Sequence, residues 1–143
     1  MHAEGLALIG ELGLARLREL SWEAAAIGGL TMGADPVAYA IARESDRLPP
    51  RLNGFSVRKA AKTHGTGRRI EGCFESGDRV IIVEDVITTG ASALEAAQAV
   101  QDEGGAVVGI LALLDRDEGG RAAIEAAGFR VSALLELRDL VPQ

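Results

Sequence analysis

Several residue types that would define a particular chemistry are scarce in this chain of 143 residues. Its one cysteine, Cys73, excludes an intramolecular disulfide framework and a thiolate metal cluster. Its two histidines, His2 and His64, are too few for a histidine-rich metal site. No apolar run approaches the roughly 20 residues that cross a bilayer, and the first residues lack the basic start of a secretion signal. These absences predict a cytoplasmic protein with no membrane partner, and no residue is predicted to be a direct side-chain ligand of a metal.

What remains is the composition of one ordinary folded domain. Apolar residues make up 48% of the chain and charged residues 25%, which is typical of globular proteins. A chain of this size buries roughly two-thirds of its surface on folding. The sequence contains no internal repeat or low-complexity tract, and we therefore expect a single domain over residues 1–143.

Charge is distributed unevenly along the chain. The net charge of −6 argues against general binding to nucleic acid. Between Arg47 and Ile70, however, the chain has no acidic residue and seven of its 15 basic residues. These are Arg47, Arg51, Arg58, Lys59, Lys62, Arg68 and Arg69. Such segregation favours an anionic partner for this segment, although short clusters of like charge also occur in plain loops.

Hydrophobic periodicity predicts that helices and strands alternate. Apolar spacing indicates a helix over residues 6–20, and residues 24–27 form a short buried run that ends in a loop at Gly28-Gly29. Asp35-Pro36 offers an N-cap and a first-turn proline for a helix that reaches about residue 44. Pro49-Pro50 then breaks the chain before a strand over residues 53–57.

The second half of the chain continues the alternation after a polar interval. Residues 59–72, KAAKTHGTGRRIEG, have no periodicity and are expected to form a long mobile loop or a loose hairpin. The strands are continuous apolar runs, as expected when helices cover both faces of a sheet. The pattern predicts the α/β class, with a doubly wound, mostly parallel sheet flanked by helices. The remaining predicted elements are strands over 80–83, 107–114 and 131–135 and helices over 91–103 and 120–127.

The stretch RVIIVEDVITTGAS, residues 79–92, carries the strongest chemical signal. Glu84 and Asp85 end a buried strand, and small hydroxyl-bearing residues then lead into a helix. Backbone N–H groups and the dipole at a helix start suit a phosphate, and Gly90 permits close approach. The two carboxylates are better suited to accept hydrogen bonds from sugar hydroxyls, directly or through Mg²⁺. The stretch predicts a site for a phosphorylated sugar, against the alternative of a strand end with a Ser or Thr cap.

Two weaker candidate sites follow other strands, and parallel strands bind ligands at their carboxyl ends. GGLTMGADP, residues 28–36, is either a second anion-binding loop or a simple tight turn. At the end of the strand over 107–114, Arg116 either presents its guanidinium group to a ligand carboxylate or pairs with Asp115, Asp117 or Glu118.

Together these residues resemble the type I phosphoribosyltransferases. VIIVEDVITTGAS resembles their motif for 5-phosphoribosyl 1-diphosphate (PRPP). Arg58 to Gly65, RKAAKTHG, matches the R-K-x-x-K-x-H-G pattern of orotate phosphoribosyltransferases, and LLDR with the following EGG resembles their orotate-side segment. The resemblance extends from about Gly28 to the C-terminus. No counterpart of the family's N-terminal hood segment is recognisable, and the chain is expected to lack it.

The resemblance implies transfer of the phosphoribosyl group from PRPP to orotate, giving orotidine 5′-monophosphate and pyrophosphate. It further implies a homodimer with shared active sites and a Mg²⁺ cofactor held through PRPP near the acid pair. Residues 28–33 would lie beside the pyrophosphate, and Thr88 and Arg116 would contact orotate. Lys62, His64 and Asp85 would be catalytic, with Lys62 or His64 donating a proton to pyrophosphate. The residues implied to bind PRPP are Arg58, Lys59, Lys62, His64, Glu84, Asp85, Val86, Ile87, Thr88, Thr89, Gly90, Ala91 and Ser92.

Other functions are compatible with part of this pattern. A phosphoribosyltransferase for another base would share the PRPP motif, and so would a regulatory module that binds PRPP without turnover. A regulator would be expected to have a nucleic-acid-binding surface, whereas the only basic segment here matches the catalytic spacing. A dinucleotide-binding domain is disfavoured because no G-x-G-x-x-G follows the first strand.

Overall fold

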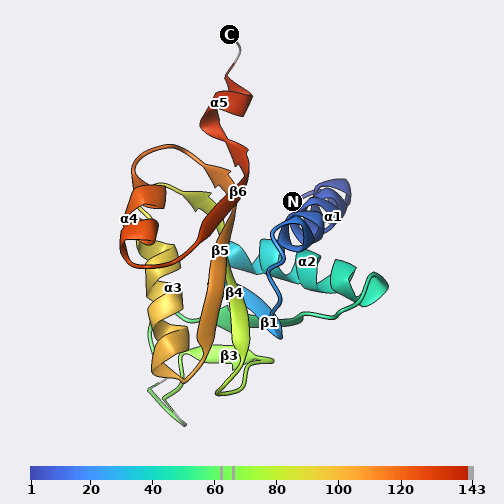
Figure 1. The fold of residues 1–143 in the computed structure, drawn as a ribbon. Helices are drawn as coiled ribbons and strands as arrows, with labels where there is room; N and C mark the ends of the chain where they lie inside the picture. The colour runs from blue at the N-terminus through green and yellow to red at the C-terminus, as the bar shows by residue number, and fades with distance from the viewer. Residues whose placement is uncertain (62, 66, 142–143) are drawn as a thin grey trace.

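The computed structural model describes residues 1–61, 63–65 and 67–141. Six of its strands form one sheet in the order β3-β2-β1-β4-β5-β6 (Figure 1). Neighbouring strands are parallel except for the β2–β3 pair at one edge, which is antiparallel. This confirms the predicted mostly parallel, doubly wound sheet. The strands are β1 (Ala26–Leu30), β2 (Asn53–Val57), β3 (Ile70–Gly72), β4 (Arg79–Ile87), β5 (Ala106–Asp115) and β6 (Val131–Glu136).

Helices cover both faces of the sheet. α1 and α2 lie on one side, and α3 and α4 lie on the other (Figure 1). Along β4, Ile81 packs into the core under α1 and α2, whereas Ile82 packs into the core under α3. Within the described residues, no helix combines the length and apolar character needed to span a membrane. The helices are α1 (Ala3–Glu19), α2 (Ala34–Arg47), α3 (Ala91–Asp102), α4 (Gly120–Ala126) and the short α5 (Leu137–Leu140).

The first strand differs from its prediction. Gly28 and Gly29 were expected in a loop but lie inside β1, where all five residues are buried. A Cβ at Gly28 would collide with the carbonyl oxygen of Phe55 on β2, and one at Gly29 would collide with that of Val83 on β4. The glycine pair therefore permits close packing in the centre of the sheet and does not mark a turn there.

Two further strands also extend beyond the predicted pattern. β4 continues four residues past the predicted end at residue 83, so that the acid pair belongs to the strand itself. β3 occupies residues 70–72, which were assigned to the polar loop, and it pairs with β2 through Phe55, Ser56 and Val57. The polar interval is therefore the connection of an antiparallel hairpin. α5 was not predicted, because its four residues are too few to show helical periodicity.

Candidate active site

The strand ends that sequence reasoning singled out lie side by side. Ile87 at the end of β4 pairs with Asp115 at the end of β5, and the Arg116 N–H donates to the Ile87 carbonyl at 3.1 Å. On the other side of β4, a Cβ placed on Gly33 would lie 2.8 Å from Asp85 Oδ2. The loop after β1, the acid pair and the end of β5 thus form one continuous region.

Within the acid pair, the pKa of Glu84 is strongly raised. Glu84 is 7% exposed, and burial raises its pKa to about 8, with further increases from a hydrogen bond to Asp85 and from the Asp85 charge. Asp85 is half-buried, and its Oδ1 accepts the Val86 N–H at 2.8 Å. At neutral pH Glu84 therefore keeps its proton.

Residues 88–92, which we term the phosphate loop, comprise the link between β4 and α3 and the first two residues of α3. Gly90 has φ 84° and a Cβ there would lie 2.9 Å from the Gly120 carbonyl oxygen, so the loop is packed against the start of α4. The N-cap residue of α3 is Gly90, which has no side chain to cap the helix, so the Ser or Thr cap considered as the alternative does not occupy that position. The Thr89 hydroxyl accepts only a long bond of 3.3 Å from the Ala91 N–H. The start of α3 can therefore receive an anion.

The loop after β1 is organised by Asp35. This residue was expected to cap α2, but the N-cap position is Gly33 and Asp35 lies in the first turn. Its carboxylate instead accepts a hydrogen bond from the Thr31 hydroxyl at 2.6 Å and another from the Ser56 hydroxyl at 2.7 Å. The peptide bond between Thr31 and Met32 is cis. Sequence reasoning missed Ser56, because a serine inside a strand gives no signal of its own.

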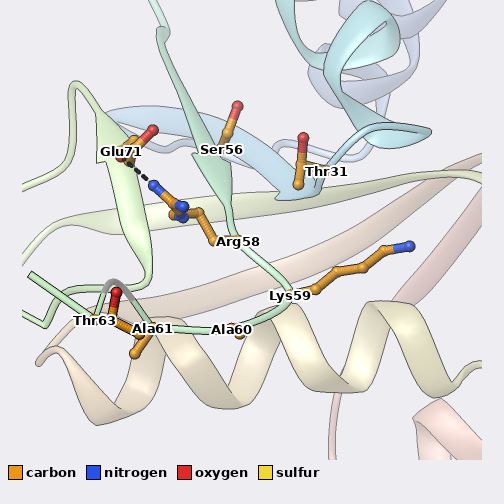
Figure 2. A pocket seen from close by; sticks show the side chains of 8 residues that line it. All are labelled: Thr31, Ser56, Arg58, Lys59, Ala60, Ala61, Thr63 and Glu71. Atoms are coloured by element: carbon orange, nitrogen blue, oxygen red, sulfur yellow. Dashed lines mark hydrogen bonds and ion pairs between the residues drawn. The ribbon is translucent and has the colours of Figure 1, made fainter.

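Residues 58–69, the cationic segment, leave β2 and return to β3. Arg58 Nη1 pairs with Glu71 Oε1 at 3.0 Å, whereas Lys59 points away from Glu71 (Figure 2). His64 is exposed, and Lys62 falls outside the described residues. Of the two predicted cations nearest β2, Arg58 is therefore held in an ion pair, whereas Lys59 is directed away from that pair.

The stem of the cationic segment is held against α3 by Arg69. Its guanidinium group donates to the carbonyl oxygens of Arg58 at 2.8 Å and Lys59 at 2.9 Å, and it pairs with Glu95 on α3. A cavity of about 550 Å³ opens between this segment and the loop after β1 (Figure 2). It is lined by Thr31, Ser56, Arg58, Lys59, Ala60, Ala61, Thr63 and Glu71.

At the end of β5, Arg116 pairs with Glu118 at 2.9 Å and is half exposed. This is one of the pairings considered as an alternative to ligand binding. Asp115 is buried and instead pairs with Arg121 on α4 at 2.9 Å. Arg116 therefore lies beside β4 as predicted, but in this structure its guanidinium group is bound by its own chain. Sequence reasoning missed Arg121, since nothing in the pattern distinguishes it from a surface arginine.

The carboxylate oxygens of the acid pair can contribute ligands to a Mg²⁺ ion, but they are too few to form a complete metal site. Among the described residues, no group of three or more His, Cys, Asp or Glu side chains could hold a metal ion. Glu84 and Asp85 supply carboxylate oxygens, which suit Mg²⁺. Such an ion would therefore take most of its ligands from a bound phosphate compound and from water.

Comparisons with known proteins agree with this geometry. Residues 2–127 match the family model for the phosphoribosyl transferase domain. The chain is similar to the orotate phosphoribosyltransferase of Mycobacterium leprae, with 50% identity over 98% of this chain and 75% of the relative. For the Aquifex aeolicus orotate phosphoribosyltransferase the identity is 45% over 96% of this chain and 74% of the relative. The crystal structure of Mycobacterium tuberculosis orotate phosphoribosyltransferase in complex with PRPP superposes with a TM-score of 0.87, at 45% identity, over 98% of this chain and 78% of that one.

Proposed function

Because the chain belongs to the orotate phosphoribosyltransferase family, we propose that it transfers the 5-phosphoribosyl group of PRPP to orotate. The products are orotidine 5′-monophosphate and pyrophosphate. The observation that carries the proposal is the position of the acid pair relative to α3. Glu84 and Asp85 lie near the end of β4, and a short connection leads from β4 to the start of α3, where Gly90 is the N-cap residue. A solved relative of 45% identity was crystallised with PRPP, which supports PRPP as the ligand of this region.

The phosphate loop and the acid pair hold the ribose 5-phosphate part of PRPP. The N–H groups at the start of α3 donate to the 5′-phosphate, helped by the helix dipole. Asp85 and Glu84 accept hydrogen bonds from the ribose hydroxyls. Glu84 can do so with both oxygens only after it loses its proton, because the pKa of the free protein's Glu84 is about 8.

The cations act on the leaving group. As the bond between the anomeric carbon and the diphosphate oxygen breaks, positive charge develops on the ribose ring and negative charge on the diphosphate, and a ring nitrogen of orotate forms the new bond. Arg58, Lys59, Lys62 and His64 on the cationic segment would stabilise the departing charge more than the ground state. At an effective dielectric near 20, one charge pair at ~4 Å contributes about 4 kcal/mol before desolvation. Lys62 or His64 supplies the proton that pyrophosphate takes up.

Orotate binding requires a change of partner at Arg116. The guanidinium group now pairs with Glu118, and it would exchange that carboxylate for the carboxylate of orotate. Half of the Arg116 side chain is exposed, so the exchange needs no opening of the core. Thr88, at the end of β4 beside Arg116, would form the other side of the base site.

The remaining properties follow from the same proposal. Mg²⁺ would bind through PRPP beside Glu84 and Asp85 and, when bound, would neutralise part of the diphosphate charge. The enzyme would work in the cytoplasm as a homodimer with shared active sites. Its net charge of −6 disfavours nucleic acid as a partner, and no membrane partner is proposed.

The proposal is tested by following orotate absorbance in the presence of PRPP and Mg²⁺. Loss of orotate that depends on PRPP is expected. Binding of PRPP without loss of orotate would contradict the proposal. Turnover of a different base would then identify a related transferase, and no turnover of any base would identify a regulatory module.

The shared site is tested by mixing two inactive variants. Lys59→Ala and Asp85→Ala subunits together should recover part of the activity if each site takes its cationic segment from the partner. A mixture no more active than its components, despite subunit exchange shown by mass spectrometry, would contradict a shared site.

A further inference from the structure

A carboxylate in a site for a departing diphosphate is unexpected on electrostatic grounds, and Asp35 is such a group. It lies in the first turn of α2, directly after the loop that lies against Asp85. Two of its hydrogen-bond partners, Thr31 and Ser56, line the cavity that also contains Arg58 and Lys59. A carboxylate at this position must therefore contribute an interaction that outweighs its repulsion of a phosphate anion.

The hydrogen bonds that Asp35 accepts from two hydroxyl groups are that interaction. The hydroxyl groups of both Thr31 and Ser56 donate to the Asp35 carboxylate, at 2.6 Å and 2.7 Å. The Tyr39 hydroxyl lies within hydrogen-bond distance of the Ser56 hydroxyl, and because the Ser56 proton is already committed, Tyr39 is the donor. The chain of bonds thus runs from Tyr39 through Ser56 to Asp35, and Thr31 joins it from the opposite side.

This network joins three separate segments. Thr31 follows β1, Asp35 lies in the first turn of α2, and Ser56 lies on β2 two residues before Arg58. The backbone adds one more link, because the Thr31 N–H donates to the Val57 carbonyl at 2.8 Å. Hydrogen bonds to a charged group are stronger than neutral ones. Asp35 therefore links the loop after β1 to the start of the cationic segment, in addition to the backbone pairing of β1 with β2.

We infer that Asp35 is a positioning residue for the diphosphate of PRPP. Through its hydrogen bonds to Thr31 and Ser56, Asp35 fixes the positions of residues 31–33 and of the end of β2. These two segments form the two sides of the diphosphate-binding site. The inference rests on the proposed function. It concerns the diphosphate side alone, since the phosphate loop lies after β4 and shares none of these hydrogen bonds.

Two ligands that each represent one half of PRPP separate this role from a general structural one. Inorganic pyrophosphate with Mg²⁺ probes the diphosphate side, and ribose 5-phosphate probes the phosphate loop. Isothermal titration of the full chain with each ligand should show that Asp35→Ala weakens pyrophosphate binding about tenfold or more, while ribose 5-phosphate binding stays within about twofold.

Conservative variants sharpen the result. Asp35→Asn keeps one acceptor and turns the other contact into a donor, so it should recover part of the pyrophosphate affinity. Thr31→Val and Ser56→Ala each remove one of the two bonds and should fall between Asp35→Ala and the wild type. Asp46→Asn removes an exposed carboxylate at the far end of the same helix and should change neither affinity.

The opposing outcomes are distinct. Unchanged pyrophosphate affinity in Asp35→Ala would overturn the inference, and so would an equal loss for both ligands, which would indicate a purely structural role. If the wild-type protein bound neither ligand, the proposed function would fail, and this inference would fail with it.

Discussion

The two sides of the candidate site are built in different ways. The phosphate loop follows β4, a strand with neighbours on both sides, and Gly90 is packed against α4. The cationic segment connects β2 to the edge strand β3, and most of its described residues are exposed. Its arginines are held by partners that they could exchange, Glu71 for Arg58 and Glu95 for Arg69. Under the proposed function, the sugar phosphate would meet groups fixed by packing, whereas the leaving group would meet exposed groups, some of them held by ion pairs.

This difference fits the chemistry proposed for each side. A group that holds the substrate throughout the reaction gains from being rigid, because no reorganisation is needed at the moment of reaction. Groups that stabilise a departing anion must reach it and then release it, and exposed ion pairs are weak enough to be exchanged. Substitutions on the two sides should therefore differ in which kinetic parameter they change.

Asp85→Asn should produce the largest effect. The amide keeps the shape of the side chain but removes the carboxylate that, under the proposed function, would accept hydrogen bonds from the ribose hydroxyls and face the positive charge on the ring. We expect kcat/KM to fall by about a hundredfold or more, as measured by orotate consumption. Asp102→Asn, an exposed carboxylate at the end of α3, is the matched control. Equal activity in the two variants would remove Asp85 from the site.

Lys59→Ala should lower kcat by about tenfold or more while changing the KM for PRPP by less than about threefold. The reason is that a cation on the exposed segment acts mainly as charge develops on the diphosphate. Arg68→Ala removes an exposed cation of the same segment outside the R-K-x-x-K-x-H-G pattern and should change kcat little. A proportional loss in kcat and in PRPP affinity would mean that Lys59 only binds.

Gly90→Ala should lower the free energy of unfolding by about 1–3 kcal/mol and weaken ribose 5-phosphate binding. The added Cβ would meet the Gly120 carbonyl oxygen at 2.9 Å, at a residue with φ 84°. Gly77→Ala is the control for backbone strain alone, because its φ is 95° and a Cβ there would meet no described atom within 4 Å. Urea unfolding that gave the same loss for both would refute the tight packing of the phosphate loop.

The smallest effect concerns Glu84 and pH. Its pKa rises from 4.5 to about 8 on folding, so between these values the unfolded chain releases a proton that the folded chain keeps. Stability should therefore fall as the pH rises through this window and should level off above about pH 8. Glu84→Gln should make that fall shallower, whereas Glu75→Gln, on an exposed side chain, should not. Identical pH profiles for wild type and Glu84→Gln would contradict a buried neutral Glu84.

The same pKa gives a signature of ligand binding. If both oxygens of Glu84 act as acceptors in the complex with PRPP and Mg²⁺, Glu84 must lose its proton on binding. Binding near neutral pH should then release this proton to the solvent, because Glu84 is protonated in the free protein. Titrations in buffers of different ionisation enthalpy measure this directly. Absence of proton release would mean that Glu84 stays neutral in the complex and acts through a single acceptor oxygen.

Much of the fold could be predicted because its signals are local. Continuous apolar runs such as Val80 to Val83 predicted strands buried on both faces, and the glycine-marked start of α3 was recognisable from TTGAS. The doubly wound sheet follows from the order of these elements. The strand limits at Gly28-Gly29 were wrong because glycine is read as a turn residue, whereas here the need for it comes from Phe55 and Val83, far along the chain.

The candidate site was predictable where neighbours in sequence are neighbours in space. Glu84, Asp85 and the phosphate loop form one stretch, and the structure keeps them together. The role of Asp35 was not predictable, because its second partner, Ser56, comes from another strand and cannot be seen in a local pattern. Arg116 shows the opposite limit, since a ligand carboxylate and three neighbouring acidic residues were all foreseen as partners, and the structure was needed to identify Glu118.

The central claim is that the sugar phosphate and the diphosphate are held by two differently built sides of one site. A crystal structure of this protein with PRPP and Mg²⁺ tests it most directly. We expect the 5′-phosphate against the backbone of Thr89 to Ser92, the ribose beside Asp85, and the diphosphate between Thr31 and Lys59. Clear density for PRPP at another place, with none beside Asp85 and Thr89, would contradict the account.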